Sequence, residues 1–129
     1  MGRVVVAVED ELGIVGVYSL GVFTLTLESL PDEIARKLPR YDAIPAALIG
    51  RLARDEKVRG RGMGELLLAD AVRRILGASK TVAVFAFAVD AKDAWAVQFY
   101  EAFDFRVFPL QPRHLFLLAS TAATAIAKI

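Results

Sequence analysis

The sequence has no cysteine and only one histidine, His114, among its 129 residues. Without cysteine the chain can form neither a disulfide nor a thiolate metal site, and it has no thiol nucleophile. A single histidine argues against a multi-histidine metal site and against an ordinary serine–histidine–aspartate triad. The sequence therefore predicts no bound metal and excludes catalysis by cysteine.

Long apolar runs are also missing, although apolar residues make up 56% of the chain and charged residues 24%. This composition excludes intrinsic disorder, which needs low hydrophobicity and high net charge. The longest uninterrupted apolar run is Val82–Val89, whereas a membrane-spanning helix needs roughly 20 apolar residues. The opening Met1–Val4 lacks the pattern of a signal peptide. We therefore expect one cytoplasmic domain over residues 1–129, with no membrane segment.

The hydrophobic pattern predicts a mixed α/β fold in which helices pack on one sheet. Apolar positions recur at three- and four-residue spacing over Gly64–Leu76, where Gly77 is expected to end the helix, and Trp95 and Phe99 are expected on the core stripe of a later helix. The expected strands are Val4–Val8, Ile14–Leu20, Val22–Leu27, Ala46–Arg54, Thr81–Val89, Phe105–Pro109 and His114–Leu118, and the expected helices are Pro31–Leu38, Gly64–Leu76 and Lys92–Phe103.

One segment has the composition of an anion-binding loop. Val58–Gly64 contains three glycines and two arginines, and it stands between an expected strand and an expected helix. Glycines allow the backbone to turn tightly and to approach a ligand closely, while a helix N-terminus directs N–H groups and positive potential at the same place. The pattern favours phosphate binding, although a solvent-exposed basic loop is the simpler alternative. It is neither a P-loop nor a Rossmann fingerprint.

The stretch Arg59-Gly60-Arg61-Gly62-Met63-Gly64 resembles the Arg/Gln-x-x-Gly-x-Gly/Ala loop of the GCN5-related N-acetyltransferases. A strand followed by a helix with Phe99-Tyr100 and then Phe103-Asp104-Phe105 resembles a second feature of that family. Asp104 departs from the family, which usually has glycine there. Because this position ends the helix with a positive φ, we expect Asp104 to adopt that conformation at a small cost in strain.

The resemblance implies that the loop amides hold the pyrophosphate of acetyl-CoA, which serves as co-substrate. It implies that Tyr100 protonates the departing CoA thiolate, since a phenol with a reference pKa of about 10 is protonated at neutral pH. It also implies that a backbone N–H near Leu52 polarises the thioester carbonyl at a strand bulge. The residues implied to contact acetyl-CoA are Leu52, Ala53, Arg54, Arg59, Gly60, Arg61, Gly62, Met63, Gly64 and Phe99.

Shorter pieces of the sequence resemble one branch of that superfamily, the acetyltransferase toxins of bacterial type II toxin–antitoxin systems. These pieces are Leu30-Pro31, Leu38–Tyr41, Ile44–Ala46, Gly50–Ala53, Val89–Asp93 and Arg113–Leu117. The resemblance implies acetylation of the α-amine of aminoacyl-tRNA and neutralisation by a ribbon-helix-helix antitoxin. It also implies an N-terminally shortened domain, because the family places a strand and one or two helices before the first hairpin.

Two other functions remain open at the level of sequence. The same loop and tyrosine would serve an acetyltransferase that acts on a small-molecule amine or on a protein N-terminus. A shortened domain could also bind CoA without turnover, or work only as a subunit of an assembly. The net charge is only +1, so any contact with tRNA would come from local basic patches. Because Val4–Val8 would form an apolar strand near an open edge, we expect at least a homodimer, which buries either this hairpin or the apolar C-terminal segment Leu115–Ile129.

Overall fold

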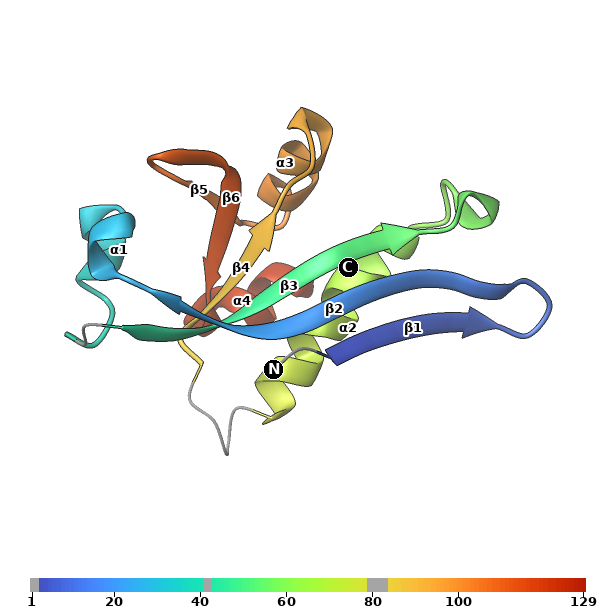
Figure 1. Cartoon of the computed structure of the whole chain (residues 1–129), viewed down its shortest axis with the longest axis horizontal. Coiled ribbons are helices and arrows are strands. Elements are labelled where there is room, and N and C mark those ends of the chain that lie inside the picture. Colours follow the sequence, from blue (N-terminus) through green and yellow to red (C-terminus); the bar gives the residue numbers. More distant parts are fainter. Residues whose placement is uncertain (1–2, 41–42, 79–83) are drawn as a thin grey trace.

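The computed structural model describes residues 3–40, 43–78 and 84–129 as one six-stranded sheet with helices on both faces (Figure 1). The strands are β1 (Arg3–Glu9), β2 (Gly13–Leu25), β3 (Ile44–Arg54), β4 (Ala86–Asp90), β5 (Arg106–Phe108) and β6 (Gln111–Leu118). The helices are α1 (Asp32–Ala35), α2 (Met63–Ala78), α3 (Ala94–Glu101) and α4 (Ala119–Ile126), with short 3-10 turns η1 (Leu27–Ser29) and η2 (Glu56–Val58).

The strand order in the sheet is β1-β2-β3-β4-β6-β5. β3 and β4 run parallel, and every other described pair is antiparallel. The parallel pairing ends where Ile49 lies beside Val89, although β3 continues to Arg54. The two strands therefore diverge toward their carboxyl ends, as Figure 1 shows. Ligands of α/β sheets commonly bind in a crevice at such a place.

Each face of the sheet has its own core. The larger cluster packs α2 and α4 against one face and includes Tyr18, Phe87 and Leu115. The smaller cluster lies on the other face around α1 and includes Ile34, and also Phe116, the neighbour of Leu115 on β6. Alternation along the strand explains this division, because successive side chains point to opposite faces. No helix among the described residues is both long and apolar enough to cross a bilayer.

The expected mixed sheet is confirmed, but several expected boundaries are wrong. Helix α2 runs through Gly77 to Ala78, so Gly77 does not end it. Strand β6 begins at Gln111, whereas a turn was expected up to Arg113. Helix α4 was not expected at all. The expected strand over residues 81–89 is described only from residue 84, and its first three residues, like Tyr41 and the opening Met1, lie outside the described residues.

Trp95 is a further correction. Its position on the helical stripe predicted a core residue, yet its exposed fraction is 67%. The indole stacks on the ring of Phe99, with centroids 6.0 Å apart and an interplanar angle of 16°. Helix α3 is shorter than expected, because the Asp93 side chain caps it by accepting a hydrogen bond from the backbone N–H of Ala96. Only the inward side of this short helix is buried, through Ala96 and Tyr100.

Candidate functional site

The glycine loop has the backbone conformation of an anion cradle. Gly60 and Gly62 adopt positive φ angles of 81° and 74°, which side chains with a Cβ rarely adopt. A Cβ on Gly60 would meet nothing within 4 Å, whereas one on Gly62 would approach the Glu65 carboxylate at 3.5 Å. The loop backbone is therefore open to an approaching ligand on the side where the glycines lack side chains.

Helix α2 begins at Met63, within the last residues of the loop, and the N–H of Leu66 donates a hydrogen bond to the carbonyl of Gly62. The first N–H groups of a helix have no intrahelical carbonyl to bind, and Gly62 has no side chain that could cap them. The positive end of the helix dipole adds to these free donors. The loop and the first turn of α2 together suit a phosphate group, and the fit with the pyrophosphate of acetyl-CoA is good.

The charged side chains of the loop are engaged with acidic neighbours. Arg59 lies 3.7 Å from Glu56, and Arg61 lies 3.8 Å from Glu9 on β1. All four side chains are exposed, so these pairs contribute little to stability and leave the arginines able to turn toward a phosphate. Lys57 donates a hydrogen bond of 3.0 Å to the carbonyl of Leu12. These contacts link the loop segment to the β1–β2 hairpin.

The bulge expected near Leu52 is present in β3. Val17 of β2 pairs with Ala53 and Ser19 pairs with Gly50, so β3 has one residue more than β2 over this stretch. Within this bulge, Arg51 adopts the strained left-handed backbone conformation, with a φ of 51°. A bulge bends its strand and changes the direction of neighbouring backbone groups. It lies beyond the last residue that pairs with β4, at the divergent end of the sheet.

Helix α3 brings Phe99 and Tyr100 close to the start of α2. A Cβ on Gly64 would lie 3.5 Å from the Phe99 ring, so the first turn of α2 approaches this aromatic side chain at van der Waals distance. The Phe99 and Tyr100 rings make an edge contact at 5.2 Å, and Tyr100 also packs on Phe105 at 5.5 Å. Tyr100 is buried, with an exposed fraction of 6%.

The environment of Tyr100 keeps its hydroxyl protonated. Burial, followed by the negative charge of Asp90, raises the pKa of Tyr100 to about 12. The phenol is therefore a hydrogen-bond donor throughout the neutral range. Asp90 ends β4 and lies beside His114 in the sheet register, with its carboxylate 2.5 Å from His114 Nδ1. His114 thus lies within β6, next to the end of the parallel pair, whereas the sequence pattern placed it at the first position of the strand.

Asp104 adopts the conformation expected where the family has glycine. Its φ is 70°, in the left-handed region, and it follows the last turn of α3. Its side chain accepts a hydrogen bond of 2.9 Å from Lys128. The backbone at Asp104 therefore keeps the left-handed conformation expected between α3 and β5. The conformation is more strained for aspartate than for glycine, because aspartate has a Cβ.

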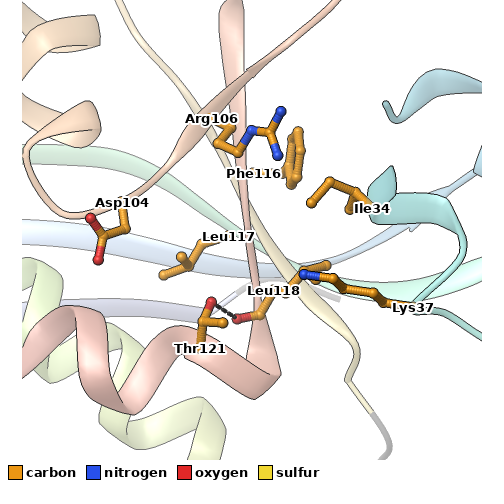
Figure 2. A pocket seen from close by; sticks show the side chains of 8 residues that line it. All are labelled: Ile34, Lys37, Asp104, Arg106, Phe116, Leu117, Leu118 and Thr121. Carbon is orange, nitrogen blue, oxygen red and sulfur yellow. Dashed lines mark hydrogen bonds between the residues drawn. The ribbon is translucent and has the colours of Figure 1, made fainter. Parts of the chain in front are cut away.

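Two polar features were not expected from the sequence. The hydroxyl of Tyr18 on β2 donates to Asp70 on α2, and Arg74 donates to the same carboxylate at 2.8 Å. Separately, a pocket of about 290 Å³ lies between α1, β5, β6 and α4. Figure 2 shows Lys37 and Arg106 at its border, with Arg106 beside Phe116. None of the residues expected to contact acetyl-CoA lines this pocket.

The described residues include no group of three or more side chains that could hold a metal ion. Of the residues implied by the resemblance, Gly64 at the start of α2 lies against Phe99 in the last turn of α3, and Phe99 in turn contacts Tyr100. Leu52, Ala53 and Arg54 lie on the diverging end of β3, immediately before η2 and the loop.

Comparison with known proteins places the chain among bacterial toxins, although no family model matches it. A "tRNA-acetylating toxin" of Mycobacterium tuberculosis is 37% identical over 113 residues, which cover 88% of this chain and 67% of the toxin. A "Probable toxin TacT" of Sinorhizobium fredii is 30% identical over 127 residues, which cover 92% of this chain and 70% of that protein.

Solved structures agree with the sequence comparison. The KacTA–DNA complex contains a chain with a TM-score of 0.78 and 25% identity, which matches 100% of this chain and 75% of that one. AtaT complexed with acetyl-methionyl-tRNAfMet has a TM-score of 0.78 and 27% identity, and matches 94% of this chain and 71% of that one. The fold expected from the loop and tyrosine motifs is therefore confirmed.

Proposed function

This chain belongs to the tRNA-acetylating toxins of the GCN5-related N-acetyltransferase fold, and from that premise we propose that it acetylates the α-amine of aminoacyl-tRNA. The donor is acetyl-CoA, and the modified tRNA blocks translation. The observation that carries the proposal is the glycine cradle at the start of α2, which lies against the aromatic face of α3. The 37% identity to a tRNA-acetylating toxin supports charged tRNA as the acceptor.

The cradle binds the pyrophosphate of acetyl-CoA through the N–H groups of residues 60–64 and the positive end of α2. Arg59 and Arg61 exchange their exposed acidic partners for phosphate oxygens, which form stronger charge-assisted hydrogen bonds. The pantetheine arm lies beside Leu52, Ala53 and Arg54, at the end of β3 that no longer pairs with β4. The N–H of Leu52 donates to the thioester carbonyl and stabilises the negative charge that develops on its oxygen. Phe99 packs against the arm from α3.

In the transfer step, the acceptor nitrogen attacks the carbonyl carbon of the thioester and forms a C–N bond. The tetrahedral intermediate then breaks its C–S bond, and the departing thiolate receives the Tyr100 proton. The nitrogen releases its extra proton to solvent, from which Tyr100 is reprotonated. An α-amino group has a reference pKa of about 7.7–8.0, and esterification of the carboxyl lowers it, so a neutral amine is available without a strong base. The enzyme thus works by positioning and by proton donation.

We also place the protein in the cytoplasm, where charged tRNA and acetyl-CoA occur together, and in a pair with a ribbon-helix-helix antitoxin. A solved complex of AtaT with the C-terminus of the antitoxin AtaR supports the second assignment. The basic residues Arg36, Lys37 and Arg40 are exposed near α1 and supply local positive charge for tRNA, which the overall net charge of +1 does not.

The test is transfer of labelled acetyl from acetyl-CoA to charged tRNA by the purified chain. Tyr100→Phe is expected to bind acetyl-CoA normally and to lose activity by about 10²–10⁴-fold, the usual contribution of a positioned acid. Gly62→Glu is expected to abolish acetyl-CoA binding in calorimetry, because a carboxylate would fill the cradle. Unchanged turnover of Tyr100→Phe would remove Tyr100 from the mechanism, and unchanged affinity of Gly62→Glu would refute the cradle.

The acceptor is tested in the same assay. Deacylated tRNA, a free amino acid and a peptide with a free N-terminus serve as competing substrates. Preference for charged tRNA supports the proposal, and preference for the peptide or the amino acid would replace it with an ordinary N-acetyltransferase. Binding of acetyl-CoA without transfer to any acceptor would favour an inactive CoA-binding domain.

A further inference from the structure

Asp90 and His114 form a pair of side chains that the transfer step described above does not use. Asp90 is the last residue of β4, and the sheet register places it opposite His114 of β6. One oxygen of the Asp90 carboxylate lies 2.5 Å from His114 Nδ1. Val89, the residue before Asp90, is the last residue of β4 that pairs with β3. The pair therefore lies at the opening between the diverging strands, where the thioester is proposed to bind.

The contact with Asp90 determines which nitrogen of His114 is free to act as a base. A carboxylate accepts hydrogen bonds, so the neutral imidazole carries its proton on Nδ1 and donates it to Asp90. The lone pair is then on Nε2, which has no hydrogen-bond partner in the part of the chain that the structure describes. The side chain of His114 is 46% exposed, so both a substrate and water can reach it.

Hydrogen bonds hold this part of β6 against the end of β4. The N–H of Ala91 donates a hydrogen bond of 2.8 Å to the carbonyl of Arg113, the residue before His114. The Arg113 guanidinium donates one of 3.1 Å to the carbonyl of Lys92. Because both bonds link β6 to the residues directly after β4, they fix the backbone from which the His114 side chain extends.

In the described part of the chain, the Asp90 carboxylate is the charged group in direct contact with His114. Arg106 of β5 lies opposite Phe116, two residues further along β6, and its guanidinium is bound by Glu33 at 3.0 Å. The charge of a protonated His114 would therefore lie beside the carboxylate of Asp90.

Tyr100 and the Asp90–His114 pair approach the opening from opposite faces of the sheet. Tyr100 belongs to the core cluster on the face of α2, together with Val89 and Leu115. Because side chains alternate along a strand, Asp90 and His114, which are the neighbours of those two residues, point to the other face. Tyr100 still senses the pair, since the charge of Asp90, after burial, raises the pKa of Tyr100 to about 12. A proton donor and a proton acceptor therefore flank the opening.

We propose that His114 is the base of the transfer step and that Asp90 is its positioning residue. The inference rests on the proposed acetyl transfer and assigns the proton that the acceptor nitrogen must lose. As the nitrogen attacks the thioester carbon and the C–N bond forms, His114 Nε2 takes the extra proton of the nitrogen. The C–S bond then breaks, and the thiolate takes the Tyr100 proton. The imidazolium releases its proton to solvent and Tyr100 regains one from solvent, so the cycle neither gains nor loses a proton.

Two variants of His114 test the assignment in the transfer assay with charged tRNA. In His114→Asn the amide nitrogen can still donate to Asp90, but the side chain has no nitrogen that takes up a proton. His114→Ala removes the ring and leaves its place open to solvent. Both are expected to bind acetyl-CoA with wild-type affinity and to lose kcat by about 10²-fold or more. Gln111→Ala, an exposed position on the same strand, is the matched control and is expected to keep the wild-type rate.

Two readouts separate proton transfer from a structural role. Added imidazole is expected to restore part of the activity of His114→Ala and none of the activity of Tyr100→Phe. Toward low pH, the logarithm of the wild-type rate is expected to fall with a slope of about two, because the acceptor amine and His114 must both be neutral, and that of His114→Asn with a slope of about one. His114 is the only histidine in the sequence, so proton NMR of the untagged chain follows its titration directly, which should coincide with the step that His114→Asn lacks.

The role of Asp90 is tested by Asp90→Asn. The asparagine amide can donate to Nδ1 and so favours the tautomer with its proton on Nε2, which cannot accept another. We expect kcat to fall while the KM for acetyl-CoA stays at the wild-type value, and we expect no rescue by imidazole, because the ring of His114 still occupies its place.

The assignment of His114 and the proposed function fail in different ways. A wild-type chain that acetylates charged tRNA, with His114→Asn as active as the Gln111→Ala control, would overturn the role of His114 and leave the proposed function in place. An unchanged slope in His114→Asn, or a loss in His114→Ala that no concentration of imidazole restores, would likewise show that His114 does not take the proton. A wild-type chain that binds acetyl-CoA and acetylates no acceptor would refute the proposed function, and this inference with it.

Discussion

Gly62 precedes α2, and Gly77 lies near its C-terminal end. Replacing each of them by alanine is expected to change the free energy of unfolding in opposite directions. Gly62 has a φ of 74°, whereas Gly77 lies inside the last turn of the helix and is not among the residues with a positive φ. The left-handed conformation costs a residue with a Cβ about 1–2 kcal/mol. The contact at Gly62, 3.5 Å from Glu65, adds no steric cost. Replacing glycine also lowers the entropy of the unfolded chain, which returns about 0.4–1 kcal/mol.

We therefore expect Gly62→Ala to reduce the free energy of unfolding by about 1 kcal/mol. Gly77→Ala places a Cβ in open space and replaces a poor helix former by the best one, a gain of up to about 1 kcal/mol that is smaller near a helix end. The assay is urea unfolding followed by circular dichroism. The free energy of unfolding should depend on urea concentration with the same slope in the wild type and both variants, which shows that the variants change stability alone. Destabilisation by Gly77→Ala of 1 kcal/mol or more would show that α2 ends at Gly77 and would refute the reasoning.

Four further predictions follow from contacts near the site and in the core. Glu65→Gln should tighten acetyl-CoA binding several-fold in calorimetry, because the carboxylate lies near Gly62 and opposes the pyrophosphate; weaker binding would count against the cradle. Burial, then the hydrogen bond to Asp70, raises the pKa of Tyr18 to about 12. Since an unfolded tyrosine ionises near pH 10, the stability present below that pH is lost as the pH rises to 12. Between pH 10 and pH 12, Tyr18→Phe should lose less stability than the wild type, and an equal loss would contradict the raised pKa of Tyr18. Asp90→Asn should lower the pKa of Tyr100 from about 12, since the Asp90 charge raises it after burial does; an unchanged tyrosinate titration would exclude that coupling. Trp95→Ala should cost less than about 1 kcal/mol in urea unfolding, because the side chain is 67% exposed, whereas a buried tryptophan would cost about 3–5 kcal/mol.

Local sequence signals predicted the parts of the site that depend on local conformation. Glycines 60, 62 and 64 indicated a tight turn before a helix, and the positive φ angles of the first two confirm the turn. The family position of Asp104 predicted its positive φ. These features depend on the allowed conformations of single residues and on the start of one helix, so a short stretch of sequence determines them.

Features that depend on tertiary contacts were not predictable in this way. Arg51 adopts a φ of 51° because β3 has one residue more than β2 opposite it, and an arginine gives no local signal of this. Tyr18 and Asp70 are 52 residues apart in sequence, so no short stretch of the sequence indicates that they meet. Helix α4 consists mostly of alanine, serine and threonine, and its buried face is formed by Ala122, Ala125 and Ile126.

The most direct test of the account is the identity of the acetylated atom. Charged tRNA is incubated with acetyl-CoA and the wild-type chain, the ester is cleaved by mild base, and the released amino acid is examined by mass spectrometry. The account predicts an N-acetyl-amino acid with wild-type protein and almost none with Tyr100→Phe. Release of only unmodified amino acid by a folded protein that binds acetyl-CoA would contradict it.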